Sequence, residues 1–541
     1  MTIVPATYEE LKAELERRRH NQTIEQEAEL LSGSLRRFIH AAWHVIEPDT
    51  VFIPGWHIDA ICDHLEAVSD GEIRRLIILV PPGTMKSRTV SVLWPAWEWT
   101  RDPRLRYLTA SYAQQLSTDL AVLSRDLIRS RWYQLRWGHI YQLKSDANLK
   151  MSYSNNRGGR RFATSVGGGG TGQHANRIII DDPLNAQDAV SNAALGEVKN
   201  WHDGTISMRF ADPRTGSEVI IMQRLHEQDL VGHVMNRDGG QWQVLCLPEE
   251  YEPKHPFVTP ETVRLTSGRE LQGDLRSQAG ELLWPAHMDE ITHAERKLAL
   301  GSFRAAGQLQ QRPSAPQGNI LQRNLWRYYD ASFLADERIG MLPRFTRIVT
   351  SWDTAFKDKT TSDFVVGATF GVIGADRYLL RLTWARLDLT ATCTALEEHY
   401  YWAVKRWPQA AHNTVVENTA NGPDVIATMK RRIPGVVPWP AKGDKTQRAI
   451  AASPDLEAGN VFLPGAYSPE LDGADPARTP AIVQDFIETC AKFPYDEHDD
   501  AVDAFSQAIN WLRSRGSGET RIASPAQARI NQPRSIPQAV G

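Results

Sequence analysis

The stretch "LIILVPPGTMKSRTVSV", residues 76–92, decides the fold of the N-terminal half of the chain. An apolar run typical of a buried strand ends in a Pro-Pro-Gly turn at Gly83, and Lys86 and Ser87 open a run with helical spacing. A strand, a tight turn and a helix form a phosphate-binding loop when backbone N–H groups, a lysine and a hydroxyl face one anion. The sequence therefore predicts either a nucleotide phosphate site or an ordinary strand–turn–helix corner that carries a lysine.

This loop departs from the usual pattern GxxxxGK[ST]. Val80 and Met85 stand where that pattern has glycines, which leaves Gly83 as the residue that can turn freely. If the loop binds ATP, Ser87 also contributes its hydroxyl to Mg²⁺. The expected phosphate contacts are Gly83, Thr84, Met85, Lys86 and Ser87.

A second motif favours the nucleotide interpretation. In "RIIIDDP", an apolar strand ends at Asp181 and Asp182. ATPases of this class hold Mg²⁺ with a carboxylate at a strand end, and a second carboxylate often orients the attacking water. Asp181 and Asp182 are placed to supply a magnesium ligand and a catalytic carboxylate, although an acidic pair at a strand end can also cap a helix. Gln223 and Arg224 end the next strand, where they are placed to sense the γ-phosphate.

Short apolar runs alternate with amphipathic runs from about residue 74 to 250, which predicts a parallel α/β sheet. The expected organisation is a helical N-terminal segment (1–50), a P-loop ATPase domain (51–250), a connecting region (251–343), an RNase H-like domain (344–513) and a flexible tail (514–541). The connecting region is rich in Pro and Gly, and the tail in Ser, Gly, Pro and Gln. At 541 residues the chain is long enough for two or more cores.

The C-terminal half predicts three strands in succession, followed by alternating helices and strands, which is the order of an RNase H-like fold. A set of acids follows this pattern: Asp353 in the first strand, Asp363 before the second, Glu417 at the end of the fourth, and Asp499, Asp500 and Asp503 opening the last helix. Nucleases with two metal ions use three or four converging carboxylates, and Mg²⁺ or Mn²⁺ prefers such hard oxygen ligands. The alternative is that Asp499 and Asp500 cap a helix, whereas a carboxylate inside an apolar strand, such as Asp353, is costly without a partner.

The stretch "AKGDKTQRA" offers Lys442, Lys445 and Arg448 as DNA phosphate contacts, or as a solvated charged face.

Charge and cysteine usage exclude some classes of protein. With 61 basic and 65 acidic residues the chain has no uniformly basic coat. Its four cysteines form no CxxC pair, and no apolar run reaches the length of a membrane span, so we expect an intracellular protein with no membrane partner.

Taken together, these motifs resemble the large terminase subunit of tailed bacteriophages. The resemblance is carried by "PPGTMKS" and "IIIDDP" in the first half and by "SWDTAF", "VVENTANG" and "HDDAVDA" in the second. Segments between them, "VIIMQRLHEQDLVGHV", "ELLWPA" and "QLQQRPSAPQGNI", are also similar to that family. The resemblance extends over roughly residues 35 to 513.

The resemblance implies an ATP-driven motor that pumps double-stranded DNA into a procapsid and cuts concatemeric DNA. It implies ATP with Mg²⁺ at the first site, and Mg²⁺ or Mn²⁺ at Asp353, Glu417 and Asp500, with Asp503 next after Asp500. It also implies docking on the portal as a pentameric ring in the host cytoplasm, with a small terminase subunit as partner. An arginine finger is expected, for which Arg157, Arg160 and Arg161 are candidates, and Asp182 stands where many members have Glu.

Two other functions remain open at the level of sequence. A helicase-nuclease of DNA repair would also hydrolyse ATP and cut DNA, but it would usually carry a second motor domain after residue 224, where we find none. A catalytically silent scaffold would bind DNA and portal, but it would be expected to lack acids that are present here.

Overall fold

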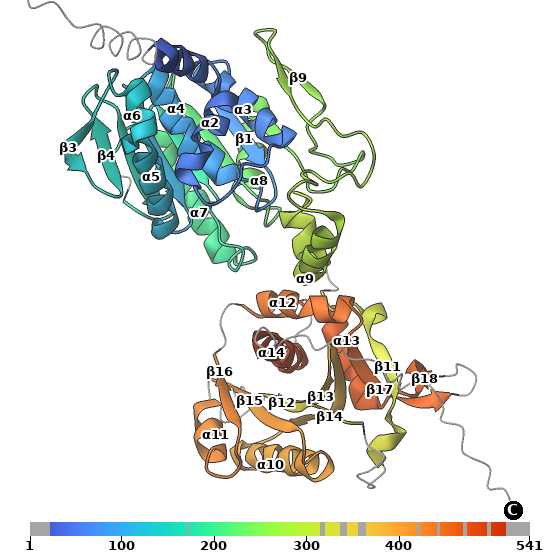
Figure 1. Cartoon of the computed structure of the whole chain (residues 1–541). Coiled ribbons are helices and arrows are strands. Elements are labelled where there is room, and N and C mark those ends of the chain that lie inside the picture. Colours follow the sequence, from blue (N-terminus) through green and yellow to red (C-terminus); the bar gives the residue numbers. More distant parts are fainter. Residues whose placement is uncertain are drawn as a thin grey trace, which may run out of the picture. The chain divides into compact units, whose positions relative to one another are not determined.

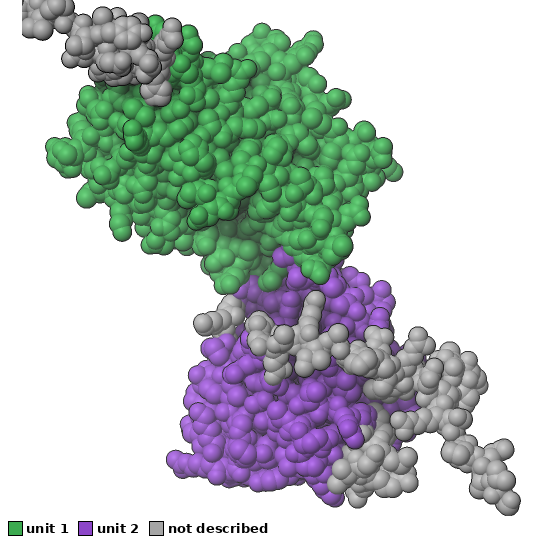
Figure 2. Space-filling view, in the orientation of Figure 1, with its two compact units in different colours: residues 1–297, 304–315 green, residues 298–303, 316–541 purple. Residues whose placement is uncertain are grey.

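The computed structural model describes residues 22–169, 172–313, 320–335, 343–354, 364–418, 422–440, 444–468, 473–494 and 499–515. These residues form two compact units, coloured separately in Figure 2: unit 1 from the ranges 1–297 and 304–315, and unit 2 from 298–303 and 316–541. The division between the units falls inside the predicted connecting region. Asp363, Lys442, residues 1–21 and the tail from residue 516 lie outside the described residues.

Unit 1 is built on a twisted sheet with the strand order β3-β4-β5-β2-β6-β7-β1-β8 (Figure 1). The strands are β1 (Arg75–Leu79), β2 (Arg106–Ser111), β3 (Leu143–Asn148), β4 (Ser152–Asn155), β5 (Arg160–Ser165), β6 (Arg177–Asp181), β7 (Ser217–Met222) and β8 (Gln243–Cys246). The six strands from β5 to β8 in this order are parallel, as predicted, whereas β3 and β4 add an antiparallel edge that the sequence pattern does not predict. Because β7 lies between β1 and β6, the loop after β1 and the acids after β6 open at the same edge of the sheet.

Helices cover both faces of this sheet. They are a helix over residues 22–32, α2 (Leu35–Ile46), α3 (Trp56–Ser69), α4 (Trp94–Arg101), α5 (Gln114–Arg129), α6 (Arg131–Trp137), α7 (Asn192–Gly204) and α8 (Leu230–Asp238). One core packs α2 to α6 against one face, and a second core packs α7 and α8 against the other. The helical N-terminal segment predicted over 1–50 is interrupted, within the described residues, at Gly33, and Ser34 then caps α2.

The helix after the β1 loop changes its hydrogen-bond register. It opens at Lys86, forms a π-helical segment over Arg88–Leu93, and continues as α4, with Pro95 in the first turn of α4. The sequence predicts that Pro95 kinks or shortens this helix, because proline lacks the N–H that an α-helix interior requires. The structure accommodates Pro95 by widening the preceding turns, since a π-helix pairs residues five apart.

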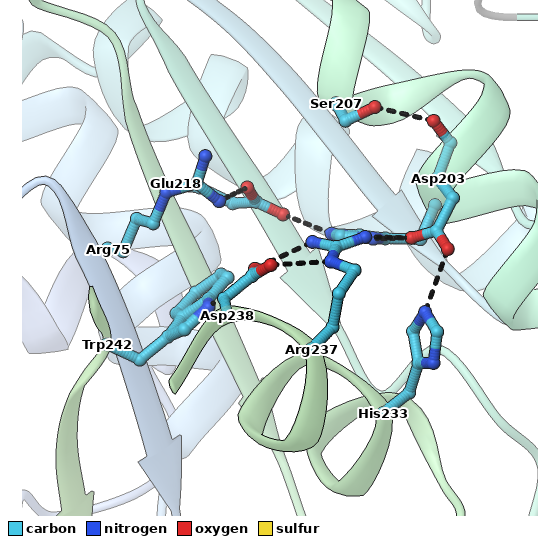
Figure 3. Close-up of polar contacts among 9 residues, drawn as sticks. Arg75, Asp203, Ser207, Glu218, His233, Arg237, Asp238 and Trp242 are labelled. Atoms are coloured by element: carbon cyan, nitrogen blue, oxygen red, sulfur yellow. Dashed lines mark hydrogen bonds and ion pairs between the residues drawn. The ribbon is translucent and has the colours of Figure 1, made fainter. Parts of the chain in front are cut away.

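A charged network joins β7 to the two helices on its face (Figure 3). Glu218, which is fully buried, accepts a hydrogen bond from His202 of α7 at 2.7 Å. Asp203 contacts His233 of α8 at 2.8 Å and also pairs with Arg237. This network lies at the start of β7, at the opposite end of the strand from the loop edge, so its role is to tie α7 and α8 to the sheet.

Unit 2 has a mixed sheet with the order β11-β17-β14-β13-β12-β15-β16, and β18 pairs with β17. The strands are β11 (Arg327–Asp330), β12 (Arg347–Asp353), β13 (Phe364–Ile373), β14 (Asp376–Arg386), β15 (Ala411–Glu417), β16 (Val436–Trp439), β17 (Val461–Ser468) and β18 (Gly473–Asp475). The strands β12, β13 and β14 are antiparallel, whereas β15 and β16 continue parallel to β12. This is the predicted RNase H-like arrangement, so the chain is an α/β protein with a P-loop unit followed by an RNase H-like unit.

The helices of unit 2 lie on the two faces of its sheet (Figure 1). They are α10 (Leu389–Arg406), α11 (Gly422–Met429), α12 (Lys445–Glu457), α13 (Ala481–Lys492) and α14 (Asp500–Arg515). Helices α10 and α11 share a core on one face, and α12, α13 and α14 share a core on the other. The predicted alternation of helices and strands is present, and α14 is the predicted last helix. Helix α12 and strands β11, β17 and β18 are not part of the predicted pattern.

The remaining elements are short or connect larger ones. They are the hairpin β9 (Thr262–Arg264) and β10 (Glu270–Gln272), helix α9 (Glu290–Gln308), and 3₁₀ turns at Ile206–Met208, Gly239–Gln241, Arg323–Leu325, Ala331–Ala335 and Pro476–Arg478. The residues of α9 belong to both units, and its backbone is non-helical at Gly301. None of the described helices has the length and apolar character needed to cross a bilayer.

Candidate functional site

The loop after β1 adopts the tight path that the Pro-Pro-Gly turn predicts. Gly83 has φ 84° and Met85 has φ 61°, so both lie in the left-handed region. That conformation is uncommon for a residue with a side chain and costs roughly 1–2 kcal/mol. Met85 thus takes a backbone conformation that glycine adopts without strain, at the position where the usual pattern has glycine. The departure in sequence does not prevent the tight turn.

The two acids after β6 meet the first two residues of the helix. Lys86 Nζ lies 2.7 Å from Asp182 Oδ1, and Ser87 Oγ donates to Asp181 Oδ1 at 2.9 Å. Asp182 itself has φ 44°, which turns the chain sharply away from the strand. The structure therefore brings together four of the predicted site residues from segments that are almost a hundred positions apart.

Asp181 is the most deeply buried acid of this group. It is 2% exposed, and Ser91 donates a hydrogen bond to its second oxygen, Oδ2, at 2.6 Å. Burial and the neighbouring Asp182 raise the pKa of Asp181 to about 6, against the opposing effects of Lys86 and the two serine hydroxyls. A buried carboxylate whose negative charge is only partly compensated is stabilised by an additional cation. This is the behaviour expected of a Mg²⁺ ligand.

Gln223 and Arg224 follow β7 but do not share one environment. The backbone N–H of Gln223 donates to Asp182 Oδ1 at 3.2 Å, and its side-chain Oε1 is buried with no hydrogen-bond partner in the described part of the chain. The guanidinium of Arg224 instead binds Asp229, with Nε 2.9 Å from Oδ2. The structure places Gln223 against the acid pair and fixes Arg224 within its own loop.

Three residues that the sequence analysis does not assign to this site support it. Arg296 of α9 donates to the carbonyl of Pro82 at 2.8 Å, and His57 Nε2 lies 3.3 Å from the carbonyl of Thr84. Burial lowers the pKa of His57 to about 4, so its ring is neutral at pH 7 and Nε2 can donate as N–H. No local pattern could have revealed Arg296, which is distant in sequence from the loop. The third, Ser91, follows Ser87 by four residues and was visible as a neighbour on one helix face.

The three candidates for an arginine finger lie on or beside β5. Arg161 is 1% exposed and donates to the carbonyl of Ser91 at 2.6 Å. Arg160 contacts Ser152, and Arg157 donates to the carbonyl of Ile140 at 2.9 Å. A residue that reaches into a neighbouring subunit has to be exposed, and Arg161 is not.

In unit 2, three acids converge from three elements. Asp353 ends β12, Glu417 ends the neighbouring parallel strand β15, and Asp503 lies in the first turns of α14. One carboxylate oxygen of each lies within 4.8 Å of the others. These hard oxygen donors from rigid elements fit a divalent cation such as Mg²⁺ or Mn²⁺.

The acid of α14 that joins this cluster is Asp503, whereas the resemblance placed Asp500 ahead of it. Asp503 is 3% exposed. Asp499 accepts the N–H groups of Val502 and Asp503 with its backbone carbonyl and so begins the helix. Asp500 remains close enough for its charge to act on Asp353.

Negative charge is crowded around Asp353. Burial raises the pKa of Asp353 well above its usual range, and Asp503, Glu417 and Asp500 raise it further, whereas Lys445 opposes them. A divalent cation would remove this repulsion, which is a second reason why the donor set fits a metal.

Two of the predicted DNA contacts lie on these acids. Lys445 Nζ lies 2.5 Å from Asp499 Oδ1 and 2.8 Å from Asp503 Oδ2. Arg448 Nη2 lies 2.5 Å from Asp503 Oδ1 and 4.0 Å from Glu417 Oε1. Both cations come from α12, and they occupy both oxygens of Asp503. The contact with DNA expected of Lys442, Lys445 and Arg448 stays a prediction.

Comparison with known proteins places the C-terminal unit. Residues 350–512 match the family model of the terminase RNaseH-like domain, and no curated protein matches the chain. Similar solved structures include the large terminase of a thermophilic bacteriophage in complex with ADP, at 9% identity and a TM-score of 0.46, covering 83% of this chain and 98% of that one. They also include the HK97 bacteriophage large terminase, at 11% identity and a TM-score of 0.32, covering 89% of this chain and 99% of that one.

The nuclease domain alone of the large terminase of the thermophilic phage G20c with bound magnesium is similar at 11% identity and a TM-score of 0.25, covering 36% of this chain and 98% of that one. The family match spans all three clustered acids. Residues 350–512 therefore form a terminase RNase H-like domain.

Proposed function

We propose that this protein is the ATP-driven motor of a bacteriophage that moves double-stranded DNA into a procapsid and cuts concatemeric DNA. The observation that carries the proposal is the cluster of Asp353, Glu417 and Asp503 inside a terminase RNase H-like domain. The preceding unit adds a phosphate-loop geometry with Lys86 and Ser87 against two acids. One chain thus offers a nucleotide site and a separate nuclease site.

At the nucleotide site, Lys86 and the loop amides would bind the phosphates of ATP. Ser87 and Asp181 would hold Mg²⁺, which neutralises charge on the phosphates. A bound phosphate competes with Asp182 for Lys86, because both are anions at the same ammonium group. Nucleotide binding would therefore release the carboxylate of Asp182 from its ion pair and leave it available to orient the attacking water.

The same contacts suggest how the site communicates with the rest of the unit. The backbone N–H of Gln223 donates a hydrogen bond to the Asp182 carboxylate. A movement of Asp182 would therefore weaken or break a hydrogen bond that holds the loop after β7. Arg224, in that loop, is fixed by Asp229 and by the side chain of Gln311, which accepts the Arg224 N–H at 2.9 Å. We infer that hydrolysis shifts this loop and with it the grip on DNA.

At the nuclease site, Asp353, Glu417 and Asp503 would hold Mg²⁺ or Mn²⁺. Bound divalent ions supply a nucleophile from water and stabilise the leaving oxygen of the phosphodiester. Lys445 and Arg448 form ion pairs with Asp503 and so compensate part of the negative charge of the acids. Once the acids bind metal, these two cations are free to contact DNA phosphates.

The partners follow from the proposed family. They are double-stranded DNA, the portal of the procapsid and a small terminase subunit, with a pentameric ring forming when the protein docks. The place of action is the host cytoplasm, with transient association with the procapsid. The arginine finger would come from a neighbouring subunit of the ring.

Two substitutions in the full-length protein test whether the sites are separate. Lys86→Ala should abolish ATP turnover and leave Mg²⁺- or Mn²⁺-dependent DNA cleavage intact, because it removes the phosphate-binding ammonium group alone. Asp353→Ala should abolish cleavage and leave ATP turnover intact. Both activities are measured on the same preparations, as phosphate release and as nicking of supercoiled DNA.

Matched controls come from the same units. Lys297→Ala removes a lysine paired with Glu250 at 2.7 Å, and Asp485→Ala removes an exposed acid of α13. Both should behave like the wild type. ATP turnover that is unchanged in Lys86→Ala, or cleavage that is unchanged in Asp353→Ala, would refute the corresponding site.

A further inference from the structure

The two oxygens of Asp181 are held by two serines of one helix. Ser87 Oγ donates to Oδ1 at 2.9 Å, and Ser91 Oγ donates to Oδ2 at 2.6 Å. The serines are four residues apart, so they lie on the same side of the helix. Ser87 is part of the expected Mg²⁺ site, whereas Ser91 has no role in the function proposed above.

The position of Ser91 follows from the π-helical segment. In an α-helix the carbonyl of Ser91 would accept from the N–H of residue 95, but Pro95 has no N–H. Arg161 of β5 donates a hydrogen bond to that carbonyl through Nη2 at 2.6 Å. The side chain of a neighbouring strand thus holds the backbone at the residue whose hydroxyl binds Asp181.

Arg161 is costly to place in this position. It is 1% exposed, and its Nε and Nη1 atoms have no hydrogen-bond partner among the described residues. Burying a guanidinium with most of its donors unused costs free energy. The hydrogen bond that the Arg161 side chain donates goes to the backbone of Ser91.

We propose that Ser91 is a positioning residue of the ATP site, whose hydroxyl fixes the Asp181 carboxylate for Mg²⁺ while Arg161 fixes the backbone that carries Ser91. This inference rests on the proposed nucleotide site. Groups that orient a metal ligand without touching the metal typically change metal affinity or activity by about 10- to 100-fold when they are removed. Without the second hydrogen bond, the carboxylate of Asp181 would rotate more freely and bind Mg²⁺ less well.

The test compares substitutions of Ser91 in the full-length protein. Ser91→Ala should reduce kcat for ATP about tenfold and raise the Mg²⁺ concentration that gives half-maximal turnover, with KM for ATP at saturating Mg²⁺ nearly unchanged. Ser91→Thr keeps the hydroxyl and should restore both values. Ser91→Cys has nearly the same volume but is a weak donor, and it should behave like Ser91→Ala.

A binding measurement separates positioning from turnover. The affinity for ADP is measured by calorimetry with and without Mg²⁺. In the wild type Mg²⁺ should strengthen ADP binding, whereas in Ser91→Ala this gain should fall about tenfold while the affinity without Mg²⁺ stays the same. If Ser91→Ala does not fold, the comparison of Ser91→Thr with Ser91→Cys decides the question.

Ser124→Ala is the matched control. Ser124 is a buried serine that donates to the carbonyl of Val92 at 3.0 Å, on the same π-helical segment. Loss of the Ser124 hydroxyl should lower the stability of the protein without changing the Mg²⁺ dependence of ATP turnover. An unchanged Mg²⁺ dependence in both Ser91→Ala and Ser91→Cys would overturn the role of Ser91. If Lys86→Ala also left ATP turnover unchanged, the nucleotide site itself would be wrong.

Discussion

At the scale of residues, the acid cluster of unit 2 shows what a sequence can and cannot specify. Asp353 and Glu417 were predictable, because a carboxylate at the end of a buried strand is costly unless a cation or hydrogen bonds compensate its charge. Which acid of α14 joins the cluster was not predictable, since Asp499, Asp500 and Asp503 all lie within about one turn of the helix start. The rotation of the helix about its axis determines which acid faces the strands. That rotation is set by the packing of Ala501, Ala504 and Phe505 in the core.

The three helix acids should differ in their effect on DNA cleavage. We expect Asp503→Asn to lower Mg²⁺- or Mn²⁺-dependent cleavage roughly 100-fold or more, because it removes a ligand of the cluster. Asp500→Asn should lower it less than about tenfold, since its charge acts on Asp353 from a distance. Nicking of supercoiled DNA and calorimetric Mn²⁺ binding measure both effects, with Asp499→Asn as a further comparison. A larger loss in Asp500→Asn than in Asp503→Asn would contradict the assignment.

At the scale of elements, the prediction succeeded where apolar periodicity marks a strand or helix and failed where it does not. Strands β1, β6 and β7 of unit 1 and β13 of unit 2 are largely apolar runs. Helix α12 buries Ala449, Ala452 and Leu456 and contains Pro454. Because most of its buried side chains are small and it contains a proline, its sequence lacks the apolar periodicity that indicates a helix. It is also the helix that carries Lys445 and Arg448 to the acids, and hence their placement could not be foreseen.

The network around His202 predicts a pH-dependent stability of unit 1. Both ring nitrogens face carboxylates, with Nε2 2.7 Å from Glu218 and Nδ1 3.0 Å from Asp203. Burial and Arg237 oppose protonation, but the hydrogen bonds to Glu218 and Asp203 and the charge of Glu218 raise the pKa of His202 above 6.5 on balance. A raised pKa in the folded state means that the stabilisation is complete below the unfolded value and is lost as the pH rises through the folded value.

We therefore expect His202→Asn to lower the free energy of unfolding at pH 6 by about 1.5–3 kcal/mol, the range for hydrogen bonds to charged groups. The difference from the wild type should shrink as the pH rises from 6 to 9. Urea unfolding at several pH values, followed by circular dichroism, measures it, and His139→Asn at an exposed position serves as control. A difference that grows with pH would contradict the charged state of His202.

At the scale of the whole molecule, the order of the two units was predictable, and the place where the chain divides was not. Each unit has its own sheet, its own cores and its own candidate site. The residues of α9 are shared between the units, and no change in composition along 251–343 marks that division. A chain with a nucleotide site in one unit and a nuclease site in the other can lose either activity without losing the other.

Packaging itself is the most direct test of the account. Procapsids that carry their portal are mixed with linear double-stranded DNA, ATP and the full-length protein, and the DNA that becomes resistant to added nuclease is measured. We predict ATP-dependent protection with the wild type and with Asp353→Ala, and none with Lys86→Ala. Protection that persists in Lys86→Ala, or that never depends on ATP in the wild type, would contradict the assignment of the chain as an ATP-driven packaging motor.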